Sequence, residues 1–122
     1  MSNNLEFDAR ELNVIIRALK RFSQFDHKMQ VSTILTLLEI ALAERNNEEI
    51  SVQDIEKRVG LQSGTASRNT YYWGEGHREN TGGHEMINIG FAPNDRRKRT
   101  LRLTNKGKAF INDVVKGVTE NG

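Results

Sequence analysis

Four consecutive basic side chains are the residues of this sequence best suited to chemistry, and that chemistry is the binding of an anion. They are Arg96, Arg97, Lys98 and Arg99, and Arg102 follows closely. Guanidinium and ammonium groups donate several hydrogen bonds and pair with phosphate oxygens. A run of like charges is usually a solvated face or a disordered tail. Here the run leads directly into the alternating segment TLRL, so we expect a folded element to hold it.

Residues for catalysis or metal binding are scarce. The sequence has no cysteine, which excludes disulfides, thiolate metal sites and cysteine nucleophiles. The phosphate-loop, nucleophile-elbow and zinc-protease motifs are absent as well. His77, Glu79, His84 and Glu85 could together bind a metal, but their spacing fits no familiar site and a glycine-rich loop holds ligands poorly. We therefore expect no enzymatic activity, no bound metal and no cofactor.

Charge is distributed unevenly along the chain. The formal net charge of the 122 residues is only +2 at pH 7. Residues 1–56 carry a net charge of −4, residues 57–108 of +7 and residues 109–122 of −1. One strongly positive segment favours an anionic partner, most often nucleic acid. A patch that merely makes the protein soluble is the alternative.

Length and composition fit one globular domain over residues 1–122. The apolar fraction is 36% and the charged fraction is 28%. The first residues are polar and acidic, unlike a secretory signal, and no apolar run approaches the roughly 20 residues of a membrane helix. We expect a cytoplasmic protein without membrane contact.

Periodic apolar positions predict two helices in the first part of the chain. Over residues 7–23 the apolar side chains recur at helical spacing, and Phe25 extends a second apolar line. Over residues 30–45 they cover nearly every face, which predicts an almost fully buried helix.

Residues 51–74 have the pattern of a helix-turn-helix. Ser51 and Asp54 form the S-x-x-D signature of a helix start. Gly60 can adopt the left-handed conformation that ends a helix. A second short helix then begins at SGTASRNTYYW, after a very short connection.

A hairpin and a last helix complete the predicted fold. After a glycine-rich loop at residues 74–85, two alternating segments flank a polar turn and predict a hairpin over 86–103. Ile50 can add a short third strand, and residues 105–118 predict the final helix. This order predicts a mainly α fold with a small β-hairpin wing (α+β), a winged helix-turn-helix.

The outward face of the second short helix suits a DNA groove. On a helical wheel Ala66, Thr70 and Trp73 fall in one sector, which predicts the buried side. The opposite face is small at its start and can form hydrogen bonds throughout. Arg68 can donate two hydrogen bonds to guanine. The two tyrosines at the end either reach phosphates and thymine methyls or cover the core.

The predicted DNA-binding residues combine this helix face with the basic hairpin. A basic hairpin beside a recognition helix reaches phosphates or an adjacent minor groove, and a solvated turn is the alternative. The set comprises Ser63, Gly64, Thr65, Ser67, Arg68, Tyr71 and Tyr72 on the helix, and Arg96, Arg97, Lys98, Arg99 and Arg102 on the hairpin.

The segment DRRKRTLRLTNKGKAF resembles the wing of the MarR-like transcription regulators, which reads D-x-R, a basic stretch and L-x-L-T-x-x-G. The matching residues are Asp95, Arg97, Leu101, Leu103, Thr104 and Gly107. With the upstream VQDIEKRVGLQSGTASR, the resemblance spans about residues 31–112. It implies that Asp95 and Arg97 shape the wing tip and that Arg97 contacts the minor groove. It also implies that Thr104 caps the last helix and that Gly107 allows close packing.

The resemblance further implies a homodimer and a small-molecule effector that the sequence does not identify. The first and last helices would form the dimer, and the apolar width of 7–25 and the valine-rich residues 110–118 agree with it. The chain departs from the family pattern at Gln62, where a capping residue is usual and Ser63 could cap instead. Its recognition helix ends in YYW, and the loop 74–85 is long.

Three functional hypotheses follow. The first is a dimeric repressor that binds pseudo-palindromic double-stranded DNA. The second is an interaction module that binds a polymerase or replication factor through an exposed YYW anchor. The third is a single-stranded nucleic-acid binder whose tyrosines stack on bases.

Overall fold

A computed structural model describes the backbone of residues 4–77, 80–81 and 83–120, and their side chains except at 77, 80–81 and 117–120. The chain divides into two compact units, Gln30–Ile111 and the two terminal segments 1–29 with 112–122. The organisation of residues 1–122 as one domain stays a prediction.

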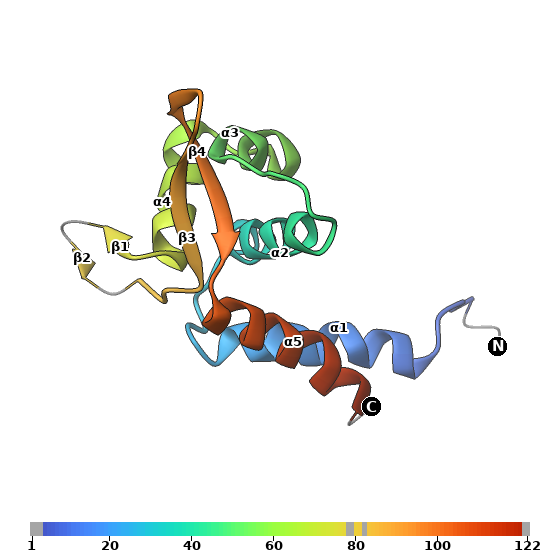
Figure 1. The fold of residues 1–122 in the computed structure, drawn as a ribbon. Helices are drawn as coiled ribbons and strands as arrows, with labels where there is room; N and C mark the ends of the chain where they lie inside the picture. The colour runs from blue at the N-terminus through green and yellow to red at the C-terminus, as the bar shows by residue number, and fades with distance from the viewer. Residues whose placement is uncertain (1–3, 78–79, 82, 121–122) are drawn as a thin grey trace. The chain divides into compact units, whose positions relative to one another are not determined.

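The larger unit contains the predicted helix-turn-helix and wing. Its helices are α2 (Val31–Arg45), α3 (Val52–Ile55), which continues as a π-helical turn η1 (Glu56–Gly60), and α4 (Ser63–Trp73), followed by the first residues of α5 (Asn105–Glu120). Figure 1 shows them in chain order by colour. The expected winged helix-turn-helix is therefore confirmed as the fold of this unit.

Helix α2 is buried along one side. Leu37, Ile40 and Ala43 are fully buried, whereas Val31 and Leu42 are exposed. The prediction of a helix buried almost all round was therefore too strong. The apolar surface of α2 is wider than the area that α3, α4 and the wing cover, so part of it stays exposed. The stripe of buried residues is enough to hold α2 in the core of this unit.

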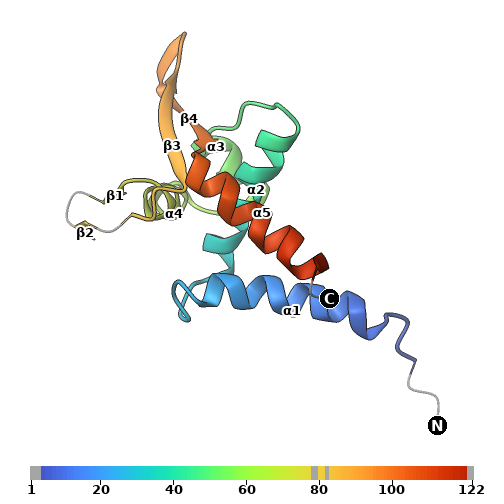
Figure 2. The same cartoon turned by 60° about the horizontal axis from the view of Figure 1, so that its bottom comes forward.

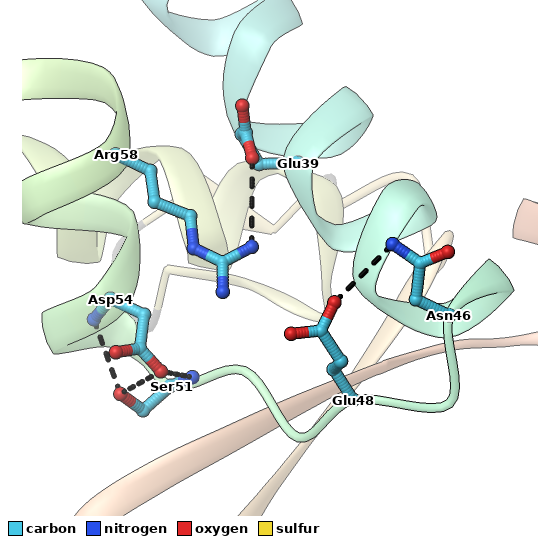
Figure 3. Close-up of polar contacts among 6 residues, drawn as sticks. All are labelled: Glu39, Asn46, Glu48, Ser51, Asp54 and Arg58. Carbon is cyan, nitrogen blue, oxygen red and sulfur yellow. Dashed lines mark hydrogen bonds and ion pairs between the residues drawn. The ribbon is translucent and has the colours of Figure 1, made fainter.

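The helix-turn-helix begins at a reciprocal cap. The amide of Asp54 donates to Ser51 Oγ at 3.2 Å, and the amide of Ser51 donates to Asp54 Oδ2 at 2.9 Å (Figure 3). Gly60 ends η1 with φ of +82°, a conformation that favours glycine. The predicted start and end of this helix are both confirmed. Nearby, Arg58 pairs with Glu39 of α2 at 3.7 Å (Figure 3).

The wing consists of two antiparallel strands, β3 (Ile87–Ala92) and β4 (Asp95–Leu103). Figure 2 shows its tip extending beyond α2, α3 and α4. The pairs from Ile87–Leu103 to Phe91–Arg99 are regular, and then the register shifts to Ala92–Asp95. Residues 96–98 therefore form a bulge on β4. The expected third strand is a single bridge between Ser51 and Thr100.

The loop predicted at 74–85 contains short paired segments. Strands β1 (Gly76–His77) and β2 (Asn80–Thr81) pair antiparallel. Such two-residue strands carry no detectable alternation in sequence. A Cβ at Gly83 would overlap the backbone of Gly74 and Gly76, so a close approach of backbones requires glycine there.

Trp73 is the largest fully buried side chain, and it joins three elements of this unit. Its indole Nε1 donates to the carbonyl of Thr33 in α2 at 2.7 Å. Its own carbonyl accepts from the amide of Met86, just before β3, at 2.7 Å. Its ring centroid lies 6.5 Å from that of Phe110 in α5. The end of α4 is thereby fixed against both the helices and the wing.

The junction of the wing with α5 agrees with the implied roles of Thr104 and Gly107. The Gly107 amide donates to Thr104 Oγ1 at 2.9 Å, which caps α5. Thr104 Oγ1 also donates to the carbonyl of Glu85 at 2.8 Å. A Cβ at Gly107 would overlap the carbonyl oxygen of Met86, so glycine permits the close packing.

The smaller unit contains α1 (Ala9–Ser23) and the end of α5. Asp8 and Glu11 form a capping box at the start of α1, and Arg21 of α1 pairs with Asp113 of α5. Leu12, Ile15 and Leu19 leave 44, 57 and 46% of their surface exposed. No helix among the described residues is long and apolar enough to cross a membrane.

Replacing Gly107 by alanine tests the close approach of α5 to Met86. We expect Gly107→Ala to lower the free energy of unfolding by about 1 to 3 kcal/mol, because the added methyl group overpacks against backbone. Urea denaturation followed by tryptophan fluorescence measures it. Gly64→Ala is the control, because its Cβ would meet nothing closer than Arg68 Nη1 at 3.8 Å. An unchanged midpoint for Gly107→Ala would refute the packing argument.

Candidate nucleic-acid interface

Helix α4 has the two faces that its sequence predicts. Ala66, Thr70 and Trp73 are fully buried, whereas Ser63, Gly64 and Arg68 are exposed. Thr65 is half-buried and accepts a hydrogen bond at Oγ1 from Arg68 Nη2 at 3.2 Å. Asn69 is buried as well, and its amide oxygen accepts from Thr33 Oγ1 at 3.0 Å. The outward face therefore begins with small residues and continues with an arginine.

The start of α4 carries no side-chain cap among the described residues. The N-cap position is Gln62, whose side chain makes no capping bond, and Ser63 is the first helical residue. The expectation that Ser63 caps the helix was therefore wrong, because its backbone already has helical geometry. Uncapped amides and the helix dipole together favour an anion at this end.

The two tyrosines at the end of α4 have different surroundings. Tyr71 faces the wing, where Arg99 Nη1 lies 3.4 Å from its hydroxyl oxygen. Tyr72 packs edge-on against Trp73 and His84, with ring centroids 5.1 and 4.7 Å apart. Tyr72 thus packs on the core, the second of the two positions considered for it, and its contact with DNA stays a prediction.

The wing tip is shaped by Asp95. Its Oδ1 accepts the backbone amide of Arg97 at 3.0 Å and the Arg97 Nε at 3.4 Å. The Arg97 side chain is nevertheless 93% exposed. Arg96 lies beside it in the bulge and is exposed as well. The bulge thus directs two arginines into solvent at the end of the hairpin.

Arg99 connects the wing with α4. Its Nη2 donates to Ser67 Oγ at 2.8 Å, and its guanidinium carbon lies 5.9 Å from the centre of the Tyr71 ring. Arg99 was predicted to contact DNA directly. In the structure it is half-buried and directed at two other members of the predicted set, so it brings the helix face and the hairpin together.

Arg102 and Lys98 form ion pairs with carboxylates on the side of the wing opposite to α4. Arg102 donates through Nε and Nη2 to both oxygens of Glu44 in α2, at 3.0 and 2.7 Å. Lys98 pairs with Glu49 at 3.3 Å. The fork of Arg102 thus has a carboxylate partner at the base of the wing, while its side chain stays 68% exposed. A contact of Arg102 with DNA stays a prediction. Alternation places Arg102 on the outward side of β4, as the structure has it, but gives no sign of its carboxylate partner.

Glu44 is a residue that the sequence analysis missed. Its side chain is 14% exposed, and Oε1 also accepts the Leu103 amide at 3.0 Å. The hydrogen bond from Arg102, with that from Leu103, lowers the pKa of Glu44 from 4.5 to about 2. No pattern in the sequence pairs position 44 with 102, because the contact depends on how α2 and β4 pack.

The ion pairs concentrate positive charge on one side of this unit. Arg58, Lys98 and Arg102 each pair with an acidic residue that precedes them in the chain. Within the described residues, neither Arg68 nor Arg96 has a carboxylate within ion-pair distance, and the contacts of Arg99 are hydroxyl groups. On the wing, Arg97 pairs with Asp95 but its side chain stays 93% exposed. The outward face of α4 and the wing tip therefore both carry exposed arginines.

A metal site finds no support where it can be judged. The described residues contain no group of three or more side chains that could hold a metal ion. His84, one of the four candidates, packs on Tyr72 and Trp73. The side chain of His77 and all of Glu79 lie outside the described residues, so their part in the candidate site is not addressed.

Comparison with known proteins identifies the fold. No family profile matches the chain, and neither does any curated protein sequence. Among solved structures, a mutant of MepR from S. aureus bound to an oligodeoxyribonucleotide matches 95% of this chain and 79% of its own, with a TM-score of 0.67 and 16% identity. The chain has the MarR-type winged-helix fold.

Two further structures agree. A mutant of MarR from E. coli complexed with operator DNA matches 92% of this chain and 76% of its own, with a TM-score of 0.58 and 17% identity. A transcriptional regulator from Thermotoga maritima matches 91% and 70%, with a TM-score of 0.64 and 16% identity. At such identities the likeness concerns the MarR-type fold. It does not transfer the ligands or target sequences of these proteins.

Replacing Glu44 tests how the base of the wing is held. A carboxyl whose pKa falls on folding stabilises the protein above its unfolded pKa, here 4.5, and loses that contribution as the pH falls towards about 2. We expect Glu44→Gln to lower the free energy of unfolding by about 1 kcal/mol at neutral pH, and the difference from wild type to shrink below pH 4.5.

Urea denaturation at several pH values measures this difference. Glu48→Gln is the matched control, because Glu48 accepts a hydrogen bond from Asn46 in its own loop instead of from the wing. A Glu44→Gln effect of the same size at every pH would contradict the assigned cause.

Proposed function

We propose that this protein is a transcriptional regulator that binds double-stranded DNA as a homodimer. The observation that carries the proposal is the bridge from Arg99 to Ser67 and Tyr71. It makes the outward face of α4 and the wing parts of one surface, on which Arg68, Arg96 and Arg97 are exposed. This surface is the proposed DNA interface.

Helix α4 enters the major groove in this proposal. The uncapped start, with Ser63 and Gly64, lets backbone amides approach a phosphate closely. Arg68 lies one turn further along the same face, where its fork can donate to O6 and N7 of guanine. Thr65 orients that fork through its hydroxyl group.

The wing contacts the phosphate backbone or the adjacent minor groove. Arg96 and Arg97 protrude from the bulge, and a narrow minor groove attracts arginine through its negative potential. The ion pair of Arg97 with Asp95 orients this guanidinium but leaves it exposed to solvent. Lys98, exchanged from Glu49 to a phosphate, adds charge without further sequence information.

The dimer forms through the apolar surface of the smaller unit. Leu12, Ile15, Ile16 and Leu19 recur on one face of α1 and are exposed in the single chain. A homodimer would cover them and present two copies of α4 to a pseudo-palindromic site. We propose that the protein acts in the cytoplasm. A dimer bound to such a site would block transcription, so we propose that it is a repressor. An effector stays a prediction from the resemblance.

The interaction-module hypothesis loses its main support in this structure. It requires an exposed YYW anchor, but Trp73 is fully buried and Tyr72 packs on it. The hypothesis that the tyrosines stack on single-stranded bases loses support for the same reason. Of the three aromatic residues at the end of α4, only Tyr71 faces the wing. Double-stranded DNA remains the partner that the charge and shape of the surface favour.

A salt titration with two variants tests the DNA interface. Affinity for duplex should fall steeply with salt, and Arg96→Ala should flatten the slope of log K against log salt by about one unit on every sequence. Arg68→Ala should instead weaken the preferred duplex by about 1 to 3 kcal/mol and relax its sequence preference. The preferred duplex comes from selection out of a random pool. Negligible wild-type affinity for duplex at low salt would reject the proposal.

A charge placed on the apolar face of α1 tests the dimer. We expect Ile15→Asp to shift the protein towards monomer in sedimentation equilibrium, because a carboxylate cannot be buried there without a partner. It should also reduce DNA affinity, since two half-sites are then no longer bound together. Asn13→Asp adds the same charge beside that face and should leave the dimer intact. A wild-type protein that is monomeric at every concentration would refute this part.

A further inference from the structure

Arg99 occupies a position in the wing where alternation predicts an apolar residue. Leu103 and Leu101 are buried, and every second residue of a strand shares a face. Arg99 is therefore the next inward residue of β4, opposite Phe91 of β3. Phe91 is 63% exposed, so the apolar core of the wing has ended at this level. The side chain that continues inward is a guanidinium.

The contacts of Arg99 fix it in two directions. Nη2 donates to Ser67 Oγ at 2.8 Å, and Nη1 lies 3.4 Å from Tyr71 Oη. Ser67 and Tyr71 are four residues apart, so they lie on the same face of α4 in successive turns. The guanidinium also lies over the Tyr71 ring. Because the fork of an arginine is planar and rigid, these contacts restrict rotation of the wing against α4.

The neighbouring cations of β4 are held on the other side. Arg102 pairs with Glu44 in the last turn of α2, and Lys98 pairs with Glu49, which lies beyond the end of α2. The middle of β4 is therefore tied in opposite directions, by carboxylates on one side and by hydroxyl groups of α4 on the other. A shift of the wing towards either side would break contacts on the opposite side.

We propose that Arg99 is a positioning residue that sets the angle between the wing and α4, and thereby the accuracy with which the protein distinguishes its target duplex. This inference rests on the proposed function. The guanidinium of Arg99 is bonded to Ser67 and Tyr71. Arg99 therefore contributes to DNA recognition by orienting the wing and not by contacting DNA. The tip arginines reach the backbone at the correct register only when the wing is held at this angle.

The first test needs no DNA. The chain has no cysteine, so spin labels can be attached at Asn94→Cys in the turn and Ser63→Cys at the start of α4. Pulsed electron paramagnetic resonance then gives the distance distribution, after dilution with excess unlabelled protein to suppress pairs between protomers. With Arg99, Ser67 and Tyr71 unchanged, the distribution of distances between the two labels should be narrow. With Arg99→Ala it should be broad.

Matched variants assign the effect to the bridge. Ser67→Ala removes one acceptor, and Tyr71→Phe removes the other but keeps the ring, so each should broaden the distribution less than Arg99→Ala. Arg99→Lys retains the charge without the fork and should be almost as broad as Arg99→Ala. Arg96→Ala should remain narrow. A narrow distribution for Arg99→Ala in a protein whose circular dichroism is unchanged would overturn the proposal.

The second test uses the selected duplex and a scrambled duplex of equal length. For Arg99→Ala we expect about a tenfold loss of affinity for the selected duplex, as for one lost hydrogen bond to a charged group. We expect little loss for the scrambled duplex and an unchanged salt slope. An equal loss on both duplexes with a slope lower by about one unit would show a direct phosphate contact and overturn the proposal.

The two tests separate the failure of this inference from that of the proposed function. If wild-type protein binds no duplex, the function fails whatever the distance distributions show. If wild-type protein binds and Arg99→Ala leaves both the distribution and the ratio of affinities unchanged, only the role of Arg99 fails.

Discussion

The larger unit depends on the burial of one side chain, Trp73, at the end of α4. A large aromatic ring in a small core contributes a substantial part of the apolar burial. Its Nε1 is satisfied by Thr33 of α2 and its carbonyl by the Met86 amide. Helix α4, helix α2 and the start of the wing therefore meet at one residue. Movement of α4 along its axis would break both hydrogen bonds.

With α4 fixed at that end, the wing is positioned from its base outward. Glu44 binds Arg102 and the Leu103 amide, which holds the last residues of β4 to α2. Higher up, Arg99 binds α4. The same contacts sort the charges: Glu49 and Glu44 pair with Lys98 and Arg102, whereas Arg68 and Arg96 have no carboxylate within ion-pair distance among the described residues. One set of contacts thus both positions the wing and determines which of its cations have a carboxylate partner.

Most of the fold could be predicted from local patterns. Ser51, Gly60 and Thr104 each have a role that depends on backbone geometry within a few residues, and the structure agrees with all three. The role of Gly107 was implied by the family resemblance, and its close approach to Met86 agrees with it. The site was harder, because charge alone does not tell which side a cation faces. For Arg102, whose contact with DNA stays a prediction, the sequence did not indicate the bond to Glu44, 58 positions away. For Arg99, alternation from Leu101 did indicate the inward face, but its charge suggested the opposite. Tyr72 covers the core because His84, from the end of a long loop, packs on it.

The central claim is that the start of α4 and the bulge of the wing form one DNA-binding surface. The most direct test is the amide ¹⁵N–¹H spectrum of the protein, titrated with the selected duplex at low salt. The account predicts that the largest shifts occur together, at residues 62–68 and 94–98, with smaller shifts in the core around Ile40. Large shifts at only one of these segments, or shifts confined to α1, would contradict it.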